Sequence, residues 1–333
     1  MNKKELELYI HIPFCVRKCS YCDFLSAPAT EQTREAYMAA LFAEIGGRAK
    51  DYSDRTVTSI FIGGGTPSLL SGEQIGQLMD RIREQFAMAQ DAEITMEVNP
   101  GTASAEKLRN FYTAGINRLS IGMQSAQAEE LKNLGRIHDF EGFCQVYREA
   151  VEAGFTNINV DIMSGLPGQT LASYRDTLEK VLHLEPMPQH ISAYSLIVEP
   201  GTPFAEQKLD LPDEDTEREM YARTAEILAE YGFFQYEISN YAKPGFACRH
   251  NIGYWKRTDY LGFGPSPASL FGNRRWTNTA DRSLYLKACG ALEKIREDEE
   301  ILSRQEADEP STTTEENEES YRYKKRSRRY RSV

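Results

Sequence analysis

Apolar residues recur along much of the chain with the spacing of an amphipathic helix, and shorter runs with strand-like composition follow. One helix is predicted over residues 73–88, where a single stripe carries Ile75, Leu78, Met79, Ile82 and Phe86. In three later segments the helical pattern ends at a glycine and a strand pattern follows, at Gly115, Gly154 and Gly232. Glycine tolerates the left-handed conformation that many helices adopt just past their last turn. The repeating unit is therefore helix, turn and strand.

Further strands are predicted from the β-rich runs LELYIHI, TSIFIGG, EITMEVN and HISAYSLIV. In all, about six strands alternate with helices up to roughly residue 200. This alternation indicates parallel strands and an α/β fold, either a doubly wound sheet or a partial or complete β/α barrel. Both architectures gather the C-terminal ends of the strands, so ligand groups are expected there. Residues 260–272 are dense in glycine, proline and aromatic residues and are interpreted as a loop.

The bulk composition is that of a globular protein with about two domains. The chain has 333 residues, 41% hydrophobic and 27% charged, and no apolar run approaches the roughly 18 residues that a membrane span needs. The net charge of −11 argues against a broad nucleic-acid surface, because duplex binding depends on basic side chains. The N-terminal sequence shows no secretion pattern. We therefore expect a cytoplasmic protein without a transmembrane segment, whose cysteines stay reduced.

Three of the six cysteines lie directly after the first predicted strand. Cys15, Cys19 and Cys22 have the spacing C-x3-C-x2-C, and in a reducing compartment such a group is typical of metal-binding or redox-active sites. Iron–sulfur clusters and structural zinc sites both normally take four protein ligands, and here the fourth is missing. A cubane cluster on three cysteines would keep one iron open to a small molecule. The alternatives are a zinc loop and three cysteines without a shared metal.

The cysteine motif, with Tyr21 before its last cysteine, resembles that of the radical S-adenosylmethionine superfamily. The resemblance implies a [4Fe-4S] cluster on Cys15, Cys19 and Cys22, one iron of which is chelated by S-adenosylmethionine. It also implies a β/α barrel, partial or complete, with the cluster at its mouth. Over residues 6 to about 302 the chain is similar to the branch that contains oxygen-independent coproporphyrinogen III oxidase and the heme chaperones, through the motifs GGGTPS, EVNPGT, SIGMQS, LGRIHD and DIMSGLPGQT.

The same resemblance assigns the residues that contact S-adenosylmethionine. Together with the cluster, Tyr9, Gly64 and Glu97 are expected to serve one molecule. Positions that contact a second molecule in the oxidase are matched by Tyr21, Gly65, Thr66, Gln124, Arg136, Asp161 and Ile197. The charged and amide side chains among them, each at or just past a predicted strand, suit a zwitterionic ligand. Each is also compatible with a solvated loop or a buried polar partner, and the glycines with a tight turn.

Two departures from the oxidase pattern favour the heme chaperones. The chain reads Cys-Asp-Phe from Cys22 to Phe24, where the oxidase pattern has a glycine and a fourth cysteine. Its first strand also begins close to the start of the sequence, whereas the oxidase carries an extra N-terminal segment. We therefore expect the chaperone rather than the oxidase.

A second motif points to heme. The segment CRHNIGYW resembles the chaperone signature H-N-x2-Y-W, with His250, Asn251, Tyr254 and Trp255 as the expected heme-binding residues. An imidazole can ligate heme iron, and aromatic rings can cover a porphyrin face. Ordinary packing explains the same residues equally well, and Cys248 is either a rival ligand or a small buried hydrophobe.

These patterns divide the chain into three parts. We expect a barrel core over residues 1–235, a heme-associated C-terminal extension over 236–303, and a charged disordered tail over 304–333. The family pattern continues with a small helical domain after SRQEA, so a truncated or frame-shifted end is expected here. The basic run in the tail is compatible with peripheral membrane contact. Cys144 and Cys289 are expected in the core, and no role is assigned to His138, His183 or His190.

The expected function is that of a heme chaperone. It would bind heme and the cluster with S-adenosylmethionine, and pass heme to an acceptor such as a respiratory heme protein. The alternative is an enzyme in which S-adenosylmethionine is cleaved and coproporphyrinogen III is oxidatively decarboxylated, with the cofactor supplying the chemistry. A homodimer is one oligomeric state that the sequence allows.

Overall fold

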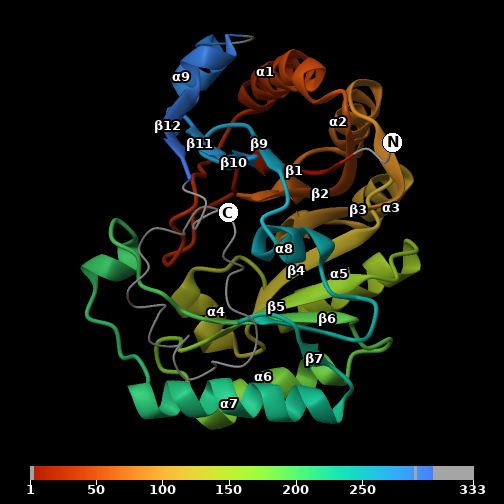
Figure 1. The fold of residues 1–333 in the computed structure, drawn as a ribbon. Helices are drawn as coiled ribbons and strands as arrows, with labels where there is room; N and C mark the ends of the chain where they lie inside the picture. Colours follow the sequence, from red (N-terminus) through yellow and green to blue (C-terminus); the bar gives the residue numbers. More distant parts are fainter. Residues whose placement is uncertain (1–3, 289–290, 303–333) are drawn as a thin grey trace.

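The computed structural model describes residues 4–288 and 291–302. Within them the strands form a single sheet of twelve strands (Figure 1). The charged tail predicted over residues 304–333 lies outside the described residues, and so does Cys289. No helix in the described part of the chain has the length and apolar character needed to cross a membrane.

Six parallel strands form the centre of the sheet and confirm the predicted alternation of strands and helices. Each strand pairs in parallel with the next one along the chain. The six are β1 (Lys4–Ile12), β2 (Arg55–Gly64), β3 (Met88–Val98), β4 (Arg118–Gln124), β5 (Ile158–Ser164) and β6 (His190–Ser195).

The helices that connect these strands lie along the outside of the curved sheet (Figure 1). They are α1 (Glu31–Ala49), α2 (Gly72–Gln85), α3 (Ala105–Thr113), α4 (Ala128–Leu134), α5 (Phe140–Glu152), α6 (Leu171–Leu182) and α7 (Glu214–Glu230). Short 3-10 turns occur at η1 (Lys50–Tyr52), η2 (Pro67–Leu69), η3 (Pro100–Thr102) and η4 (Pro203–Glu206). Most of the helices begin after a side chain that accepts a hydrogen bond from the first turn, namely Thr30, Ser71, Ser104, Asp139, Thr170 and Asp213.

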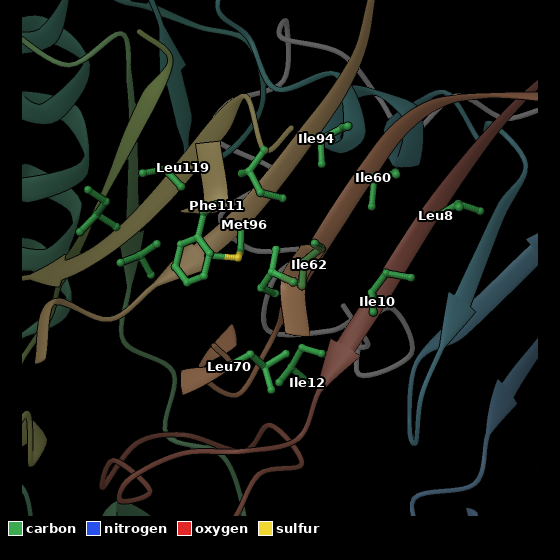
Figure 2. Packing of buried hydrophobic residues seen from close by; sticks show 14 of the residues in the cluster. Leu8, Ile10, Ile12, Ile60, Ile62, Leu70, Ile94, Met96, Phe111 and Leu119 are labelled. Carbon is green, nitrogen blue, oxygen red and sulfur yellow. The ribbon is translucent and has the colours of Figure 1, made fainter. Parts of the chain in front are cut away.

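The outer face of the sheet is apolar and packs against these helices. Successive side chains of a strand point to opposite faces, so Leu8 and Ile10 of β1 lie beside Ile60 and Ile62 of β2, all fully buried (Figure 2). Each such side chain contributes about 1.5–3 kcal/mol when it is buried. The alternate positions of the same strands carry polar side chains on the inner face, among them Glu7, Tyr9, His11, Ser59, Glu93, Glu97, Arg118, Ser120, Asn159, Asp161, His190 and Ser192.

The C-terminal part of the described chain extends both edges of the sheet. One edge gains β8 (Asn240–Ala242), antiparallel to β6, and then β7 (Phe234–Gln235). The other gains β9 (Tyr260–Phe263), which is parallel to β1, and the antiparallel strands β10 (Ala268–Phe271), β11 (Arg274–Asn278) and β12 (Arg296–Ile301). The remaining elements are α8 (Arg249–Trp255), α9 (Arg282–Lys287) and η5 (Leu292–Lys294). The end strands β12 and β7 are not paired with each other in the described residues, so the barrel is partial.

A buried polar network fastens the C-terminal strands to α1. The Arg48 guanidinium donates to the Gly262 carbonyl at 2.8 Å and to Asn278 Oδ1 at 2.7 Å. The Glu44 carboxylate accepts from Asn278 Nδ2 at 2.9 Å and from the Tyr285 hydroxyl at 2.7 Å. Because these buried groups bond one another across elements far apart in sequence, the network specifies one position of the extension on the barrel.

Three local predictions are corrected by the structure. Residues 260–272 are not a loop, because β9 and β10 occupy most of this segment and only the glycine–proline stretch between them turns. The helix predicted over residues 73–88 ends at Gln85, and Met88 already begins β3. The strand pattern after Gly232 forms only the two-residue β7, which pairs antiparallel at the sheet edge. In these segments the local sequence indicates which residues are apolar, but the pairing between strands decides where each element begins and ends.

Candidate functional site

The three motif cysteines lie in the loop that follows β1, and all three are half-buried. The loop is closed by hydrogen bonds from Cys15 N to the Ala27 carbonyl and from Ala27 N to the Pro13 carbonyl, each 3.2 Å long. His11 Nε2 lies 2.9 Å from the Leu25 carbonyl. The His11 ring thus ties the loop to β1, and its nitrogen on that side is already occupied by a backbone partner.

The glycine loop after β2 joins the cysteine loop along its backbone. Gly65 N donates to the Ile12 carbonyl at 2.9 Å, and Thr66 N donates to the Phe14 carbonyl at 2.7 Å. A Cβ atom on Gly65 would lie 2.6 Å from the Phe14 carbonyl oxygen and 2.7 Å from that of Ile12. Only glycine allows the two loops to approach so closely.

The hydroxyl of Thr66 and the guanidinium of Arg136 reach two of the cysteine sulfurs. Thr66 Oγ1 lies 3.2 Å from Cys15 Sγ, and Arg136 Nη1 donates to Cys19 Sγ at 3.7 Å. Arg136 lies beyond α4, so the prediction that it sits at or just past a strand is wrong. It reaches the site because the end of α4 folds back over the cysteine loop.

The fold-back is held by contacts between the two segments. Ser20 N donates to the Leu134 carbonyl at 3.1 Å, and Arg17 Nη2 donates to the Gly135 carbonyl at 2.7 Å. Arg17 was not singled out from the sequence. Its place inside the cysteine motif is the one sequence signal that points to it.

The donor set fits an iron–sulfur cluster. Burial, with a smaller contribution from the neighbouring Cys19 and Cys15 sulfurs, raises the pKa of the Cys22 thiol to about 12, so the three sulfurs lie close to one another. In the described part of the chain no three His, Cys, Asp or Glu side chains are already arranged around a single metal ion. On binding a shared iron–sulfur cluster the three thiols would lose their protons.

The structure brings together Tyr9, Gly64 and Glu97, the trio expected to serve one S-adenosylmethionine. Gly64 N donates to Glu97 Oε2 at 3.0 Å. Burial raises the pKa of Glu97 to about 8, and the nearby Asp161 carboxylate adds to the rise. Tyr9 is only 4% exposed, and burial together with Glu97 raises its pKa. The side chains of Tyr9 and Glu97 and the backbone of Gly64 share one polar corner of the inner face.

The residues matched to a second S-adenosylmethionine are spread over a wider area. Gln124 ends β4 with a φ of 70°, and its Oε1 accepts from the Tyr194 hydroxyl at 2.8 Å. Asp161 lies in the middle of β5, not at a strand end, and accepts from Asn159 Nδ2 at 2.7 Å. Ile197 follows β6 with an exposed side chain.

Tyr21 and Tyr194 belong to the same polar corner. Burial raises the pKa of Tyr21, and the Arg136 guanidinium opposes that rise. Burial raises the pKa of Tyr194, and the nearby Tyr21 and Asp161 contribute to the rise. Tyr194 is not among the residues predicted from the sequence. Its inward position in the alternating strand HISAYSLIV is the signal that could have found it.

The H-N-x2-Y-W motif lies on α8, which rests on the inner face of the sheet, away from the cysteine loop. Glu93 of β3 accepts from Arg249 N at 3.1 Å and from His250 N at 3.3 Å, so it caps the start of this helix. Glu93 and Glu97 are four residues apart on one strand, which corresponds to about 13 Å. The motif and the cysteine loop therefore face the same interior at different depths.

The His250 ring is fully buried and bonded on both sides. Its Nδ1 lies 2.8 Å from Ser59 Oγ and its Nε2 lies 2.9 Å from the Tyr254 hydroxyl. Burial lowers its pKa to about 3, with a further contribution from Arg118. Tyr254 packs edge-on against both His250 and Tyr260. In this arrangement His250 is a neutral, satisfied side chain, and its role as a heme ligand stays a prediction.

The remaining motif residues and cysteines take different environments. Asn251 and Trp255 lie half-buried on α8. Cys248 is fully buried and its Sγ lies 3.3 Å from Glu93 Oε1, while burial raises its pKa to about 12. Cys144 packs against the core from α5, which confirms the expected core position.

Comparison with known proteins identifies the family of this site. The profile described as the Radical SAM superfamily matches residues 9–181. Over 260 residues the chain is 44% identical to the heme chaperone HemW of Escherichia coli (strain K12), covering 78% of this chain and 68% of that protein. The chain belongs to the HemW family of radical SAM proteins. The HemW of Bacillus subtilis (strain 168) is 40% identical over 283 residues, 84% of this chain and 74% of its own length.

A solved structure from the wider superfamily confirms the fold. Coproporphyrinogen III oxidase (HemN) from Escherichia coli, described as a radical SAM enzyme, superposes with a TM-score of 0.81 and 30% sequence identity. The match covers 91% of this chain and 73% of that chain. Membership of the radical SAM superfamily implies a [4Fe-4S] cluster and S-adenosylmethionine. The predicted partial barrel with a C-terminal extension is thereby confirmed.

Proposed function

We propose that this protein is a heme chaperone. It binds heme and a [4Fe-4S] cluster with S-adenosylmethionine, and it transfers the heme to an acceptor heme protein, such as a respiratory one, in the cytoplasm. The observation that carries the proposal is the 44% identity to the heme chaperone HemW of Escherichia coli over 78% of this chain. Similar identities to the heme chaperones of Haemophilus influenzae and Bacillus subtilis support it.

Cys15, Cys19 and Cys22 hold the cluster in this proposal, and Tyr9, Gly64 and Glu97 serve the S-adenosylmethionine beside it. When bound, the cluster supplies one-electron chemistry and an iron site open to that molecule. The chain's own contribution is to place the three thiols in one loop and to close that loop with the glycine turn after β2. A second S-adenosylmethionine would use Tyr21, Gly65, Thr66, Gln124, Arg136, Asp161 and Ile197.

The heme site is proposed around His250, Asn251, Tyr254 and Trp255 on α8. Coordination of heme iron by His250 requires one ring nitrogen to lose its partner, Ser59 or Tyr254, and the fully buried ring to become accessible. Burial keeps the imidazole neutral, which is the form that binds iron. Heme binding at His250 is therefore expected to be coupled to a local rearrangement around this ring.

The test uses the full chain purified anaerobically with its cluster reconstituted. Heme is titrated into the protein and the absorption band of bound heme is followed. In parallel, coproporphyrinogen III is supplied with S-adenosylmethionine and dithionite, and porphyrin products are separated by chromatography. We expect a saturable heme band with a stoichiometric end point and no conversion of coproporphyrinogen III. Absence of heme binding would contradict the proposal.

The second candidate function is that of the coproporphyrinogen III oxidase. It is favoured by the structural match to HemN at a TM-score of 0.81. Position 24 is Phe24, with an exposed side chain, where the oxidase pattern expects a fourth cysteine. Conversion of coproporphyrinogen III in the assay above would establish this function in place of the chaperone.

A further inference from the structure

We propose that Thr66 and Arg136 donate hydrogen bonds to the cluster-ligating sulfurs of Cys15 and Cys19 and thereby raise the reduction potential of the cluster. The inference deepens the proposed function and rests on it in one respect, namely that these cysteines hold a cluster. The resemblance matches both residues to a second S-adenosylmethionine, whereas the inference gives them a role toward the cluster itself. Both act as positioning residues, through the sulfurs.

Thr66 is held rigidly against the cysteine loop. Its backbone N–H donates to the Phe14 carbonyl at 2.7 Å, its side chain is 5% exposed, and its hydroxyl lies 3.2 Å from Cys15 Sγ. A thiolate bound to iron has no proton to give. The hydroxyl must therefore be the donor once the cluster is in place, and the sulfur accepts.

Arg136 approaches the neighbouring cysteine from the opposite segment. Its Nη1 points to Cys19 Sγ at 3.7 Å, and its Nη2 is fixed by the Gly122 carbonyl at 2.7 Å. Its Nε is buried and has no hydrogen-bond partner. The backbone just before it is pinned by Arg17, which donates to the Gly135 carbonyl. The guanidinium is thus a fixed positive charge beside a cluster ligand.

These contacts favour the reduced cluster over the oxidised one. Reduction adds one electron to the cluster and no proton to the protein, so the negative charge on the sulfurs grows. Hydrogen bonds to cluster sulfurs are among the factors that set the potentials of such clusters. A positive charge is felt more strongly in a half-buried site than in water. The arginine should therefore contribute more than the threonine.

The Thr66 contact is tested with a pair of near-isosteric variants. Thr66→Val removes the hydroxyl and keeps the shape, whereas Thr66→Ser keeps the hydroxyl. Each reconstituted protein, without S-adenosylmethionine or heme, is titrated with dithionite and mediators while the signal of the reduced cluster is followed by electron paramagnetic resonance. We expect a lower midpoint potential for Thr66→Val and a potential close to wild type for Thr66→Ser.

The Arg136 contact is tested in the same titration. Arg136→Met should lower the midpoint potential more than Thr66→Val does, and Arg136→Lys should recover part of the loss because it keeps the positive charge. Arg175→Met removes an exposed arginine of α6 that pairs with Glu179, and it serves as the control with an unchanged potential. Iron and acid-labile sulfide are counted for every variant.

The outcomes separate the two proposals. A wild-type protein that assembles no cluster overturns the proposed function, and the inference falls with it. A fully loaded wild type whose potential matches those of Thr66→Val and Arg136→Met overturns the inference alone. Loss of iron from Thr66→Val but not from Thr66→Ser also overturns it, because the hydroxyl would then be needed for cluster binding and not for the potential.

Discussion

Single residues outside the cysteine motif hold the cysteine loop in place. The His11 ring forms a hydrogen bond with the Leu25 carbonyl. Gly65 allows the loop after β2 to lie against the Ile12 and Phe14 carbonyls. Neither residue is among the proposed cluster ligands. The position of the three sulfurs therefore depends on contacts that their own spacing does not encode.

The cysteine ligands give the first prediction. Replacing any one of Cys15, Cys19 or Cys22 by serine should abolish the reconstituted cluster, because three thiolates are the only protein ligands that the proposed site has. Iron and sulfide content report the loss. Cys144→Ser, on α5 outside the site, is the matched control and should keep wild-type content. An unchanged iron count in a loop variant would reject the assignment.

The glycine loop gives the second prediction. Gly65→Ala should destabilise the fold by about 1–3 kcal/mol and lower cluster occupancy, because the added methyl group has no room between two backbone carbonyls. Thermal unfolding and iron content measure the two effects. Gly76→Ala in α2 is the control, since a Cβ there meets nothing within 4 Å, and it should be neutral or stabilising by up to about 1 kcal/mol. Equal behaviour of the two variants would contradict the steric argument.

Among the elements, α8 has the most consequential position. It is a short helix, and its contacts reach three central strands through Glu7, Ser59 and Glu93. His250 and Tyr254 of its motif face the interior of the partial barrel. The helix thus couples the expected heme residues to the packing of the sheet, so that a substitution there affects stability as well as ligand binding.

Two substitutions on α8 separate these effects and form the third prediction. His250→Ala should lower the free energy of unfolding by about 1–3 kcal/mol, because Ser59 and Tyr254 lose a buried partner, and it should also weaken heme binding. Tyr254→Phe removes the partner of Nε2 and leaves the imidazole in place. If His250 is the iron ligand, Tyr254→Phe retains the spectrum of bound heme and His250→Ala loses it. An unaltered heme titration for His250→Ala would count against the ligand.

At the scale of the whole molecule, the sheet divides an apolar outside from a polar inside. The outer face packs against helices and supplies the hydrophobic stabilisation, and Figure 2 shows its apolar side chains on β1, β2 and β3. The inner face holds carboxyl groups away from water. Burial raises the pKa of Glu7 to about 8 and that of Glu97 to about 8. Such perturbed groups are typical of functional interiors.

The pH dependence of stability is the fourth prediction. A carboxyl with a folded pKa of about 8 and an ordinary value of 4.5 keeps a proton in the folded state that the unfolded chain has released. Stability should therefore fall as pH rises through this interval, by about 1.4 kcal/mol per pH unit for each full proton. Buried histidines act in the opposite sense below 6.5, so the fall should be visible between pH 6.5 and 8.

Glu7→Gln isolates one of the two carboxyl groups. The variant should lose less stability than wild type between pH 6.5 and 8, and the remaining fall should come from Glu97 and its neighbour Asp161, whose pKa burial also raises. Urea unfolding at the two pH values measures both slopes. Identical slopes for wild type and variant would show that Glu7 does not carry the proton.

The spacing of apolar residues predicted the helices and strands correctly where an element has one apolar face. The stripe from Ile75 to Ile82 became α2, and Gly115 and Gly154 adopt positive φ values after their helices, as expected. Residues 260–272 were misread, because glycine and proline dominate the local signal while pairing with β1 makes the strand. Strand pairing connects residues far apart in sequence, so no local pattern contains it.

The sequence by itself determined the alternation of helices and strands, because the apolar period changes along the chain, and it pointed to the family and to three expected cluster ligands, because the spacing of the cysteines lies within one short segment. Only the tertiary structure decided that Arg136 folds back to Cys19, that Thr66 reaches Cys15, and that His250 is enclosed between two hydroxyl groups. The contacts of Cys15 with Thr66, of Cys19 with Arg136 and of Ser59 with His250 join residues 51, 117 and 191 positions apart, and only the contact between His250 and Tyr254 lies within one helix. Two polar groups so far apart in sequence meet only if the order and register of the strands bring them together. The packing of the whole sheet sets that order and register.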